Sequence, residues 1–292
     1  MSKPKSTKLT TVKAAADAFV KSHRFDGLAF HYTRTVSRYV KLLVKHYGPR
    51  ELDELTPEDL LKSMSKDWHN TTKANYLRVI KTFCAWARDN NYLPHDRRTV
   101  AERTKVPRVI PAEPEFFTPE EMRRLLTVAG MLVGGEEEYL LSLLVLGGFV
   151  GMRQSEICRV DWRDINLLPT FQAVRLSPRV TKTGSRRIAI IPPNAVLWLN
   201  HISDKTGPVV PAGMMQNINR PIGKLAKEAG VTWKDNGLRH SYVTYAMAKE
   251  RNAYMVAEQV GNSPQILQRH YKGLVLEPDA DEWFGITPDS IL

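Results

Sequence analysis

One tyrosine near the end of the sequence lies among basic residues. Tyr271 stands in the stretch LQRHYKG, where Arg269, His270 and Lys272 are its neighbours. A phenol in this setting has two interpretations: an amphipathic surface side chain beside solvated charges, or a nucleophile for a phosphate group that cations hold. The stretch alone does not separate the two, so the chemistry depends on what the rest of the chain supplies.

Three further polar residues occupy positions that suit an anionic ligand. Arg153 opens a short helical pattern in GMRQSEICRV, where a guanidinium and free backbone N–H groups can bind an anion together. Lys182 lies in the turn TKTGS, and Arg239 opens the otherwise apolar helix of NGLRHSYVTYAMA. Each also has a plain structural interpretation: an ion pair of Arg153 with Glu156, a solubilising turn lysine, and a capping or surface arginine.

Periodicity along the chain indicates the elements that must position these side chains. Thr56 and Thr118 each precede a proline and two acidic residues, which is the pattern of a capped helix start. Beyond Thr118, the sequence predicts helices over residues 118–128, 136–147, 214–229, 238–251, 253–260 and 263–273. Between them, FQAVRLS and RRIAIIP predict two strands, joined by a glycine-containing turn that carries Lys182.

The last predicted helix is the one that holds the tyrosine. Ser263 is its expected N-cap, Pro264 takes its first position and Gly273 ends it. Tyr271 therefore belongs to the final turn of a short, capped helix.

Composition limits the class of protein and of partner. The 292 residues are 42% apolar and 25% charged, which is typical of a globular protein. Lys and Arg number 42 against 31 acidic residues, and the net charge of +11 favours a polyanionic partner. The longest apolar run, which starts at Tyr139, is too short to span a bilayer, and no secretory signal is recognisable, so no membrane partner is expected. Cys84 and Cys158 lie in apolar segments and are expected to be core thiols in the reducing cytoplasm.

The N-terminal part is predicted to be helical, with one basic face. In NTTKANYLRVIKTFCAWARDN, Arg78, Lys81 and Arg88 fall opposite an apolar face. The apolar face consists of Tyr76, Val79, Ile80, Phe83, Trp86 and Ala87. The basic face is either solvated or in contact with phosphates; in the second case, removing all three cations lowers the salt dependence of binding by about two to three units of the log–log slope.

Four motifs follow one another in a fixed order and spacing. They are Gly-x-Arg-x-x-Glu-Ile from Gly151, Lys-Thr-Gly in the hairpin, Leu-Arg-His-Ser from Leu238, and Gly-x-Ser-Pro with Tyr271 nine residues after Asn262. In this combination, nearly the whole chain resembles the tyrosine recombinase, or phage integrase, family. The resemblance implies a mainly α fold with a small antiparallel β-sheet. It also implies that residues 1–105 are an all-helical core-binding domain, 106–116 a linker and 117–292 an α+β catalytic domain with a C-terminal tail.

The resemblance assigns a role to each motif residue by position. Tyr271 would be the nucleophile, Arg153 and Arg239 the phosphate clamp, Lys182 the proton donor for the leaving oxygen, and Glu156 a support for the Arg153 region. Two guanidiniums can stabilise the charge that develops on a phosphodiester, so no metal or other cofactor is expected. The basic neighbours of Tyr271 are expected to favour its phenolate.

Two positions depart from the family pattern. The family usually has histidine three residues before the second arginine and in the segment before the tyrosine helix, where this chain has Asn236 and Asn262. An amide cannot accept and return a proton near neutral pH. If no other base exists, cleavage should accelerate with pH towards the phenol pKa near ~10. His240 and His270 flank the site in sequence; a packing role is predicted for His240, and both are candidates for a relocated base.

The resemblance implies a site-specific enzyme that exchanges strands of double-stranded DNA through a 3′-phosphotyrosine. Its expected form is a homodimer on one site and a tetramer when two sites pair, located at the nucleoid. Two alternatives stay open: a catalytically silent DNA-binding or architectural relative, and a DNA-relaxing enzyme like the type IB topoisomerases. Covalent trapping on nicked DNA distinguishes the recombinase from the silent DNA-binding relative. Recombination between two sites distinguishes it from the DNA-relaxing enzyme.

The C-terminal segment LVLEPDADEWFGITPDSIL is acidic, whereas the chain as a whole is basic. Trp283 and Phe284 are candidate anchors for an apolar groove. We expect residues 277–292 to dock on a neighbouring protomer, so that their deletion spares DNA binding and weakens assembly. Packing on its own chain is the alternative.

Overall fold

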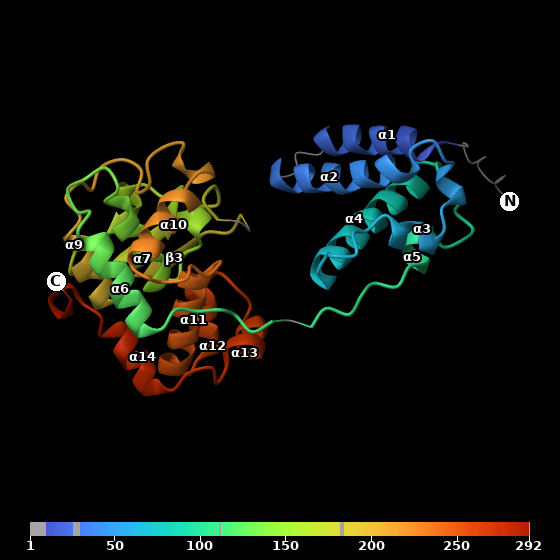
Figure 1. Cartoon of the computed structure of the whole chain (residues 1–292). Helices are drawn as coiled ribbons and strands as arrows, with labels where there is room; N and C mark the ends of the chain where they lie inside the picture. The colour runs from blue at the N-terminus through green and yellow to red at the C-terminus, as the bar shows by residue number, and fades with distance from the viewer. Residues whose placement is uncertain (1–9, 26–29, 111, 182–183, 292) are drawn as a thin grey trace. The chain divides into compact units, whose positions relative to one another are not determined.

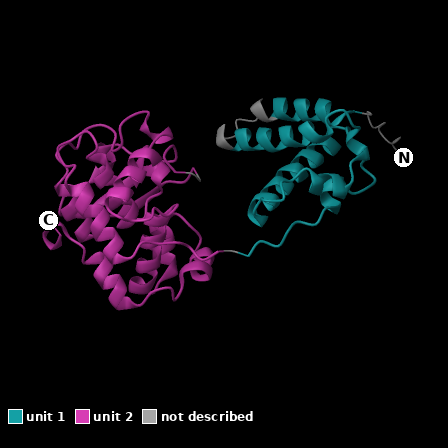
Figure 2. Ribbon diagram, in the orientation of Figure 1, with its two compact units in different colours: residues 1–111 teal, residues 112–292 magenta. Residues whose placement is uncertain are grey.

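The computed structural model describes residues 10–25, 30–110, 112–181 and 184–291. The chain divides into two compact units, residues 1–111 and 112–292, which Figure 2 draws in different colours. The boundary falls within the predicted linker, residues 106–116, where the described residues form neither helix nor strand. Lys182 lies outside the described residues. The roles predicted for the two parts of the chain remain predictions.

Residues 1–111 contain a set of packed helices (Figure 1). They are α1 (Val12–Phe25), α2 (Phe30–Tyr47), α3 (Pro57–Lys62), α4 (Asn70–Asp89) and α5 (Val100–Arg103). The predicted start of α3 is confirmed, because the Thr56 hydroxyl accepts the Asp59 N–H at 3.2 Å and the Asp59 carboxylate accepts the Thr56 N–H at 2.9 Å. The apolar face of α4 is buried as predicted, except for the half-buried Trp86. The ring centroids of its Phe83 and of Phe19 in α1 are 5.2 Å apart.

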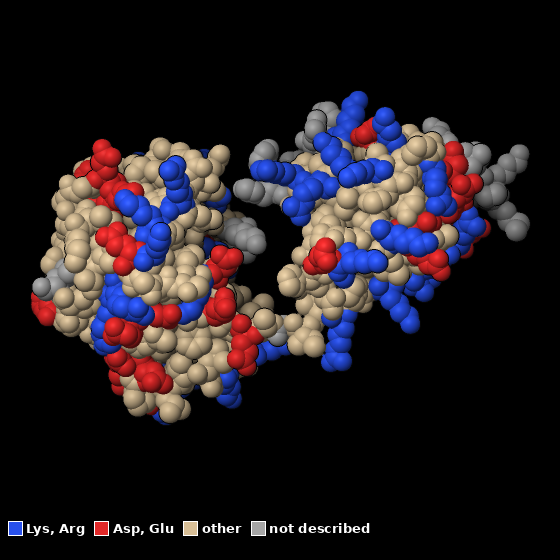
Figure 3. Space-filling view, viewed as in Figure 1, with Lys and Arg blue, Asp and Glu red and all other residues tan. Residues whose placement is uncertain are grey.

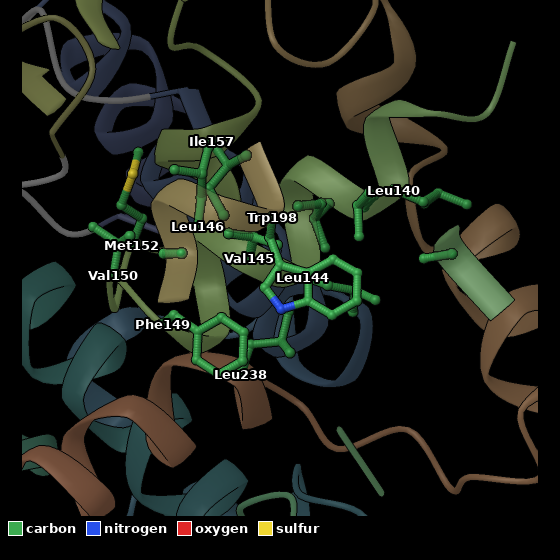
Figure 4. Packing of buried hydrophobic residues seen from close by; sticks show 14 of the residues in the cluster. Leu140, Leu144, Val145, Leu146, Phe149, Val150, Met152, Ile157, Trp198 and Leu238 are labelled. Carbon is green, nitrogen blue, oxygen red and sulfur yellow. The ribbon is translucent and has the colours of Figure 1, made fainter. Parts of the chain in front are cut away.

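Residues 112–292 are built around a helix that is buried along its whole length. Every residue of α7 (Tyr139–Gly148) is buried. Figure 4 shows Leu144 and Val145 of this helix, with Phe149 just after it, in one cluster with Trp198 of α9. The other helices of this unit are α6 (Pro119–Gly130), α8 (Gln154–Ile157), α9 (Pro193–Asn200), α10 (Asn219–Glu228), α11 (Gly237–Glu250), α12 (Ala253–Val260), α13 (Pro264–Tyr271) and α14 (Glu277–Phe284). Among the described residues, no helix is both long and apolar enough to cross a membrane.

A small antiparallel sheet interrupts the helices of this unit. Its strands β1 (Ile165–Asn166), β2 (Ala173–Leu176) and β3 (Arg187–Ile190) lie in the order β1-β2-β3. Leu176 pairs with Arg187, and Val174 pairs with both Ala189 and Ile165. The two predicted strands contain β2 and β3. The sequence did not predict β1, because a strand of two residues has no measurable alternation.

The helix predicted over residues 214–229 is shorter than expected. A single 3₁₀ turn occupies Met214–Gln216, and α10 begins only at Asn219. Pro221 explains the late start, because its ring and missing N–H are tolerated in the first turn of a helix and not further inside. The sequence also left α9 and α14 unpredicted, because their N-cap residues, Pro192 and Leu276, provide no side-chain cap.

The C-terminal segment packs on its own unit, which corrects the predicted docking on a neighbour. Trp283 of α14 is 0% exposed, and its indole N–H donates to the Gly148 carbonyl at 3.0 Å. Its ring stacks on that of Tyr245 in α11, with 4.5 Å between centroids. Phe284, the other predicted anchor, is half-buried. The sequence could not decide between the two arrangements, because the same aromatic side chain fits an apolar groove of either chain.

Replacing Trp283 by Phe should therefore destabilise residues 112–292. The ring remains apolar, but the buried Gly148 carbonyl loses its donor, which should lower the free energy of unfolding by about 1–3 kcal/mol. Urea denaturation of the full chain measures this loss, with Phe284→Leu as a partly exposed comparison that should cost less. An unchanged midpoint for Trp283→Phe would contradict the packing of α14 in this core.

The net charge of the chain resides in residues 1–111. This unit has 22 Lys and Arg against 11 Asp and Glu, whereas residues 112–292 have 20 of each. Figure 3 shows basic side chains over much of the visible face of the first unit, and both signs mixed on the second. The long-range attraction to a polyanion therefore comes from residues 1–111, while any cation in the second unit acts locally.

Candidate active site

Glu156 is the centre of an ionic cluster in residues 112–292. Its carboxylate is 0% exposed and lies between the guanidiniums of Arg153 and Arg187. Arg153 donates to it twice, from Nη1 at 3.0 Å and from the backbone N–H at 2.9 Å. Arg187 donates from Nη1 at 3.0 Å and from Nη2 at 2.6 Å. The structure thus contains the Arg153–Glu156 pair, together with a second arginine that the sequence analysis did not single out.

Two glycine carbonyls orient the arginines of the predicted clamp. Arg239 Nη1 donates to the Gly151 oxygen at 2.8 Å, and Arg153 Nη2 donates to the Gly261 oxygen at 3.2 Å. Gly151 has φ +76°, and a Cβ there would lie 2.4 Å from the ring of Tyr242. Gly261 ends α12 with φ +63°. Both turns need the left-handed conformation that glycine adopts without strain, so the two carbonyls depend on these glycines.

Arg239 is buried and has an unused donor. The residue is 8% exposed, and its Nη2 has no hydrogen-bond partner among the described residues. Burial, followed by the charge of Arg153, lowers the pKa of Arg239 to about 9. A buried guanidinium with an unsatisfied N–H is costly, and a phosphate oxygen would supply both the acceptor and the opposite charge. The arrangement therefore favours an anion beside Arg239.

Tyr271 contacts a histidine from the neighbouring helix. The tyrosine is 7% exposed at the end of α13, and its hydroxyl lies 2.6 Å from Nδ1 of His240 in α11. The two ring centroids are 5.8 Å apart. The packing role predicted for His240 is therefore incomplete, because the imidazole also forms a hydrogen bond with the phenol. The first turn of α11 supplies both Arg239 and this contact.

The expectation that basic sequence neighbours favour the phenolate of Tyr271 is wrong. Arg269 and Lys272 are exposed to solvent. Burial raises the pKa of Tyr271, and Arg239, from another helix, is the group that opposes this rise. Adjacent residues on a helix point about 100° apart, so neighbours in sequence need not share the environment of the phenol. Near neutral pH the tyrosine is protonated, and its attack on a phosphate requires a proton acceptor.

Among the described residues, Asn236, Asn262 and His270 make no side-chain hydrogen bond to Tyr271. Asn236 precedes α11 with φ +56° and is exposed. The Asn262 side-chain oxygen accepts the Ser263 N–H at 3.1 Å. The side chain of His270 is half-buried and forms no hydrogen bond with a described residue, and Lys182 lies outside those residues. Their catalytic roles remain predictions.

Two residues that hold this site together were not predicted from the sequence. Arg187 is at the start of β3, and Gln259 of α12 exchanges hydrogen bonds with the backbone of Ile190 at 2.8 and 2.9 Å. The alternation along this strand could have placed Arg187 on the inward face, because Arg187, Ala189 and Ile191 alternate with outward residues and the last two are buried. A positive charge on an inward face indicates a buried acidic partner.

The predicted basic face of α4 is only partly available. Arg78 is exposed and donates to the Asn75 side-chain oxygen at 2.6 Å, and Lys81 is half-buried. Arg88 instead lies 3.2 Å from the Glu102 carboxylate of α5. Because Glu102 already pairs with Arg88, Arg78 and Lys81 are the more available candidates, and phosphate contacts by all three residues remain a prediction.

The grouping of a buried phenol with two guanidiniums has the chemistry of enzymes that attack phosphodiesters through a tyrosine. Residues 115–272, more than half of the chain, match the model of the Phage integrase family. The chain therefore belongs to the phage integrase family, and the resemblance seen in its motifs is confirmed.

Similar curated proteins carry the name tyrosine recombinase. One from Thermosipho africanus is 24% identical over 250 residues, which cover 80% of this chain and 83% of the relative. Another from Pseudothermotoga lettingae is 22% identical over 253 residues, which cover 82% of this chain and 84% of the relative.

Solved structures support the fold class. A lambda integrase dimer bound to a COC′ core site gives a TM-score of 0.72 at 12% identity, covering 92% of this chain and 79% of that one. The Tn1549 transposon integrase in complex with a circular intermediate DNA gives a TM-score of 0.69 at 15% identity, covering 94% and 98%. The predicted mainly α fold with a small antiparallel sheet is confirmed.

Proposed function

We propose that this chain is a site-specific DNA recombinase that cleaves and rejoins duplex DNA through a 3′-phosphotyrosine at Tyr271. The observation that carries the proposal is the neighbourhood of Arg239. Its buried guanidinium has an unused donor, and the next residue, His240, contacts the hydroxyl of the buried Tyr271. Membership of the phage integrase family supports the same reaction class.

The chemistry follows from charge development during the attack. When the Tyr271 oxygen bonds to phosphorus, negative charge grows on the non-bridging oxygens, where Arg153 and Arg239 would stabilise it. The 5′-oxygen leaves with a proton, for which Lys182 is the predicted donor. The phosphotyrosine bond retains the energy of the broken phosphodiester, so rejoining needs no ATP. We propose that the guanidiniums supply the positive charge that a metal supplies in other phosphoryl transfers.

Charge and the solved relatives support DNA as the partner. The excess of 22 basic over 11 acidic residues in residues 1–111 suits phosphate contacts and counterion release. Similar structures include a lambda integrase dimer bound to a core site and a tetramer bound to a Holliday junction. By this likeness we propose that the chain acts as a dimer on one site and a tetramer on two, at the nucleoid.

Covalent trapping tests the proposed function. The DNA that flanks the gene should be sequenced for inverted repeats, and a nicked, radiolabelled duplex with such a repeat incubated with the protein. Cleavage next to the nick releases a short strand that diffuses away, so the phosphotyrosine complex accumulates and migrates slowly in a denaturing gel. Binding without this band would favour the silent DNA-binding alternative. Relaxation of supercoiled DNA without exchange between two sites would favour the topoisomerase-like alternative.

The first unit should account for much of the salt dependence of binding. Replacing Arg78 and Lys81 by Ala should lower the slope of log K against log salt by about two units if both contact phosphates. Arg88→Ala should change the slope less, because Glu102 already pairs with Arg88 at 3.2 Å. Gel-shift titrations of duplex DNA over a range of salt concentrations measure the slope. An unchanged slope in the double variant would assign this face to solvent.

A further inference from the structure

The contact between His240 and Tyr271 joins two elements that are far apart in the chain. His240 lies in the first turn of α11 and Tyr271 in the last turn of α13, 31 residues later. Nδ1 and the phenol oxygen are 2.6 Å apart, which is a short hydrogen bond. The tyrosine is 7% exposed and the histidine half-buried, so water has little access to the phenol proton. The imidazole is therefore the group placed to receive that proton.

The other candidates are chemically or geometrically unsuited. Asn236 and Asn262 carry amides, which do not accept a proton near neutral pH. The Asn262 oxygen is also engaged with the Ser263 N–H at 3.1 Å. His270 precedes Tyr271 directly on α13, and adjacent helical side chains point about 100° apart. The family positions for a base are thus occupied by residues that cannot serve, while a histidine at another position touches the reacting atom.

We infer that His240 is the general base of strand cleavage, a role that the family pattern gives to other positions. This inference rests on the proposed function. In the forward step the Tyr271 oxygen forms a bond to phosphorus, the bond from phosphorus to the 5′-oxygen breaks, and the phenol proton moves to Nδ1 of His240. The leaving oxygen takes a proton from Lys182. In the rejoining step a 5′-hydroxyl forms a bond to phosphorus and gives its proton to the neutral Lys182. The bond from phosphorus to the Tyr271 oxygen breaks, and His240 returns its proton to the departing phenolate.

The electrostatic setting keeps His240 ready to accept a proton. Burial, followed by the charge of Arg239, lowers the pKa of His240. Among the described residues, the charged and titratable groups that act on the imidazole are Arg239 on its own helix and Tyr271 on α13. A lowered pKa means that His240 is already neutral at pH 7 and protonated only below its usual value of about 6.5. Tyr271, whose pKa is raised by burial, depends on this acceptor.

The pH dependence of single-turnover cleavage tests the inference. Wild-type cleavage of the nicked duplex should rise with pH below about 6.5, as His240 loses its proton, and stay level above pH 7. His240→Asn keeps an amide near the position of Nδ1 but cannot accept the proton. This variant should cleave roughly 10²–10⁴-fold more slowly at pH 7, and its rate should keep rising towards about pH 10. His201→Asn, the same change at an exposed position of this unit, should follow the wild-type profile.

Chemical rescue separates a base from a packing residue. His240→Ala leaves a space of the size of an imidazole, and added imidazole should restore cleavage in proportion to its unprotonated fraction. Three results would each overturn the inference: a His240→Asn profile that stays level above pH 7, faster cleavage by that variant, or no rescue of a folded His240→Ala protein. These experiments test the role of His240 only if the wild type forms its covalent complex with DNA. The absence of that complex would instead refute the proposed function.

Discussion

Tyr271→Phe should abolish the covalent complex with DNA while leaving DNA affinity within about twofold of the wild type. The substitution removes only the hydroxyl, and the ring keeps its packing between α11 and α12 in residues 112–292. Without the phenol oxygen no bond to phosphorus can form, so the covalent complex should be completely absent. Denaturing gels of protein with nicked, radiolabelled duplex measure the complex, and gel shifts measure the affinity.

A second tyrosine provides the matched control for this experiment. Tyr254 of α12 is 70% exposed, and Tyr254→Phe removes a hydroxyl from the same unit without touching His240. This variant should form as much covalent complex as the wild type. If Tyr271→Phe still formed a slow-migrating band of wild-type intensity, the nucleophile would be a different residue.

Glu156→Gln should cause the largest loss of stability that we expect from a single isosteric change. The amide has the shape of the carboxylate but no charge, so the Arg187 guanidinium, whose side chain is 8% exposed, is left buried without a counterion. Breaking a buried ion pair in this way costs about 3–5 kcal/mol. Urea denaturation of the full chain at pH 7 measures the difference. A loss below about 1 kcal/mol would show that the burial of Arg187 does not depend on the charge of Glu156.

The pH dependence of this difference identifies the carboxylate as its source. Burial acts to raise the pKa of Glu156, but the hydrogen bonds from Arg187 and from the Arg153 backbone outweigh it, and the folded-state pKa is lowered. Glu156 therefore contributes its stability at pH values above the unfolded pKa of about 4.3, and this contribution is lost as the pH falls through the folded value. The difference in the free energy of unfolding between wild type and Glu156→Gln should be largest at pH 7 and should decrease below about pH 4. Glu258→Gln, at an exposed position, should show no such difference.

Helix prediction succeeded where a local signal was strong. The threonine caps of α3 and α6, the apolar run of α7 and the Ser263 cap of α13 all lie where the sequence predicts them. These features depend on residues within one or two turns of each other, so their physical cause is visible in a short window. The helices α9 and α14 were missed, whereas the equally short α13 was predicted, because α9 and α14 follow Pro192 and Leu276 and have no side-chain cap.

Predictions about single side chains failed where a distant element set the environment. The pKa of Tyr271 was expected to fall because of its sequence neighbours, whereas burial raises it. The C-terminal segment was expected to bind a neighbour, whereas Trp283 is part of the core of its own unit. Burial depends on which faces of elements distant in sequence pack together, and a short stretch of sequence does not predict this packing.

The sequence by itself determined the order and spacing of Arg153, Lys182, Arg239 and Tyr271, and hence the family and the kind of chemistry, because motifs and helix periods are properties of neighbouring residues. Only the tertiary structure decided which side chains touch. The contacts of Glu156 with Arg187 and of His240 with Tyr271 each join residues 31 positions apart. Such pairs form when β3 and α13 pack against the elements that precede them, and the spacing of residues along the chain does not encode which of their faces meet.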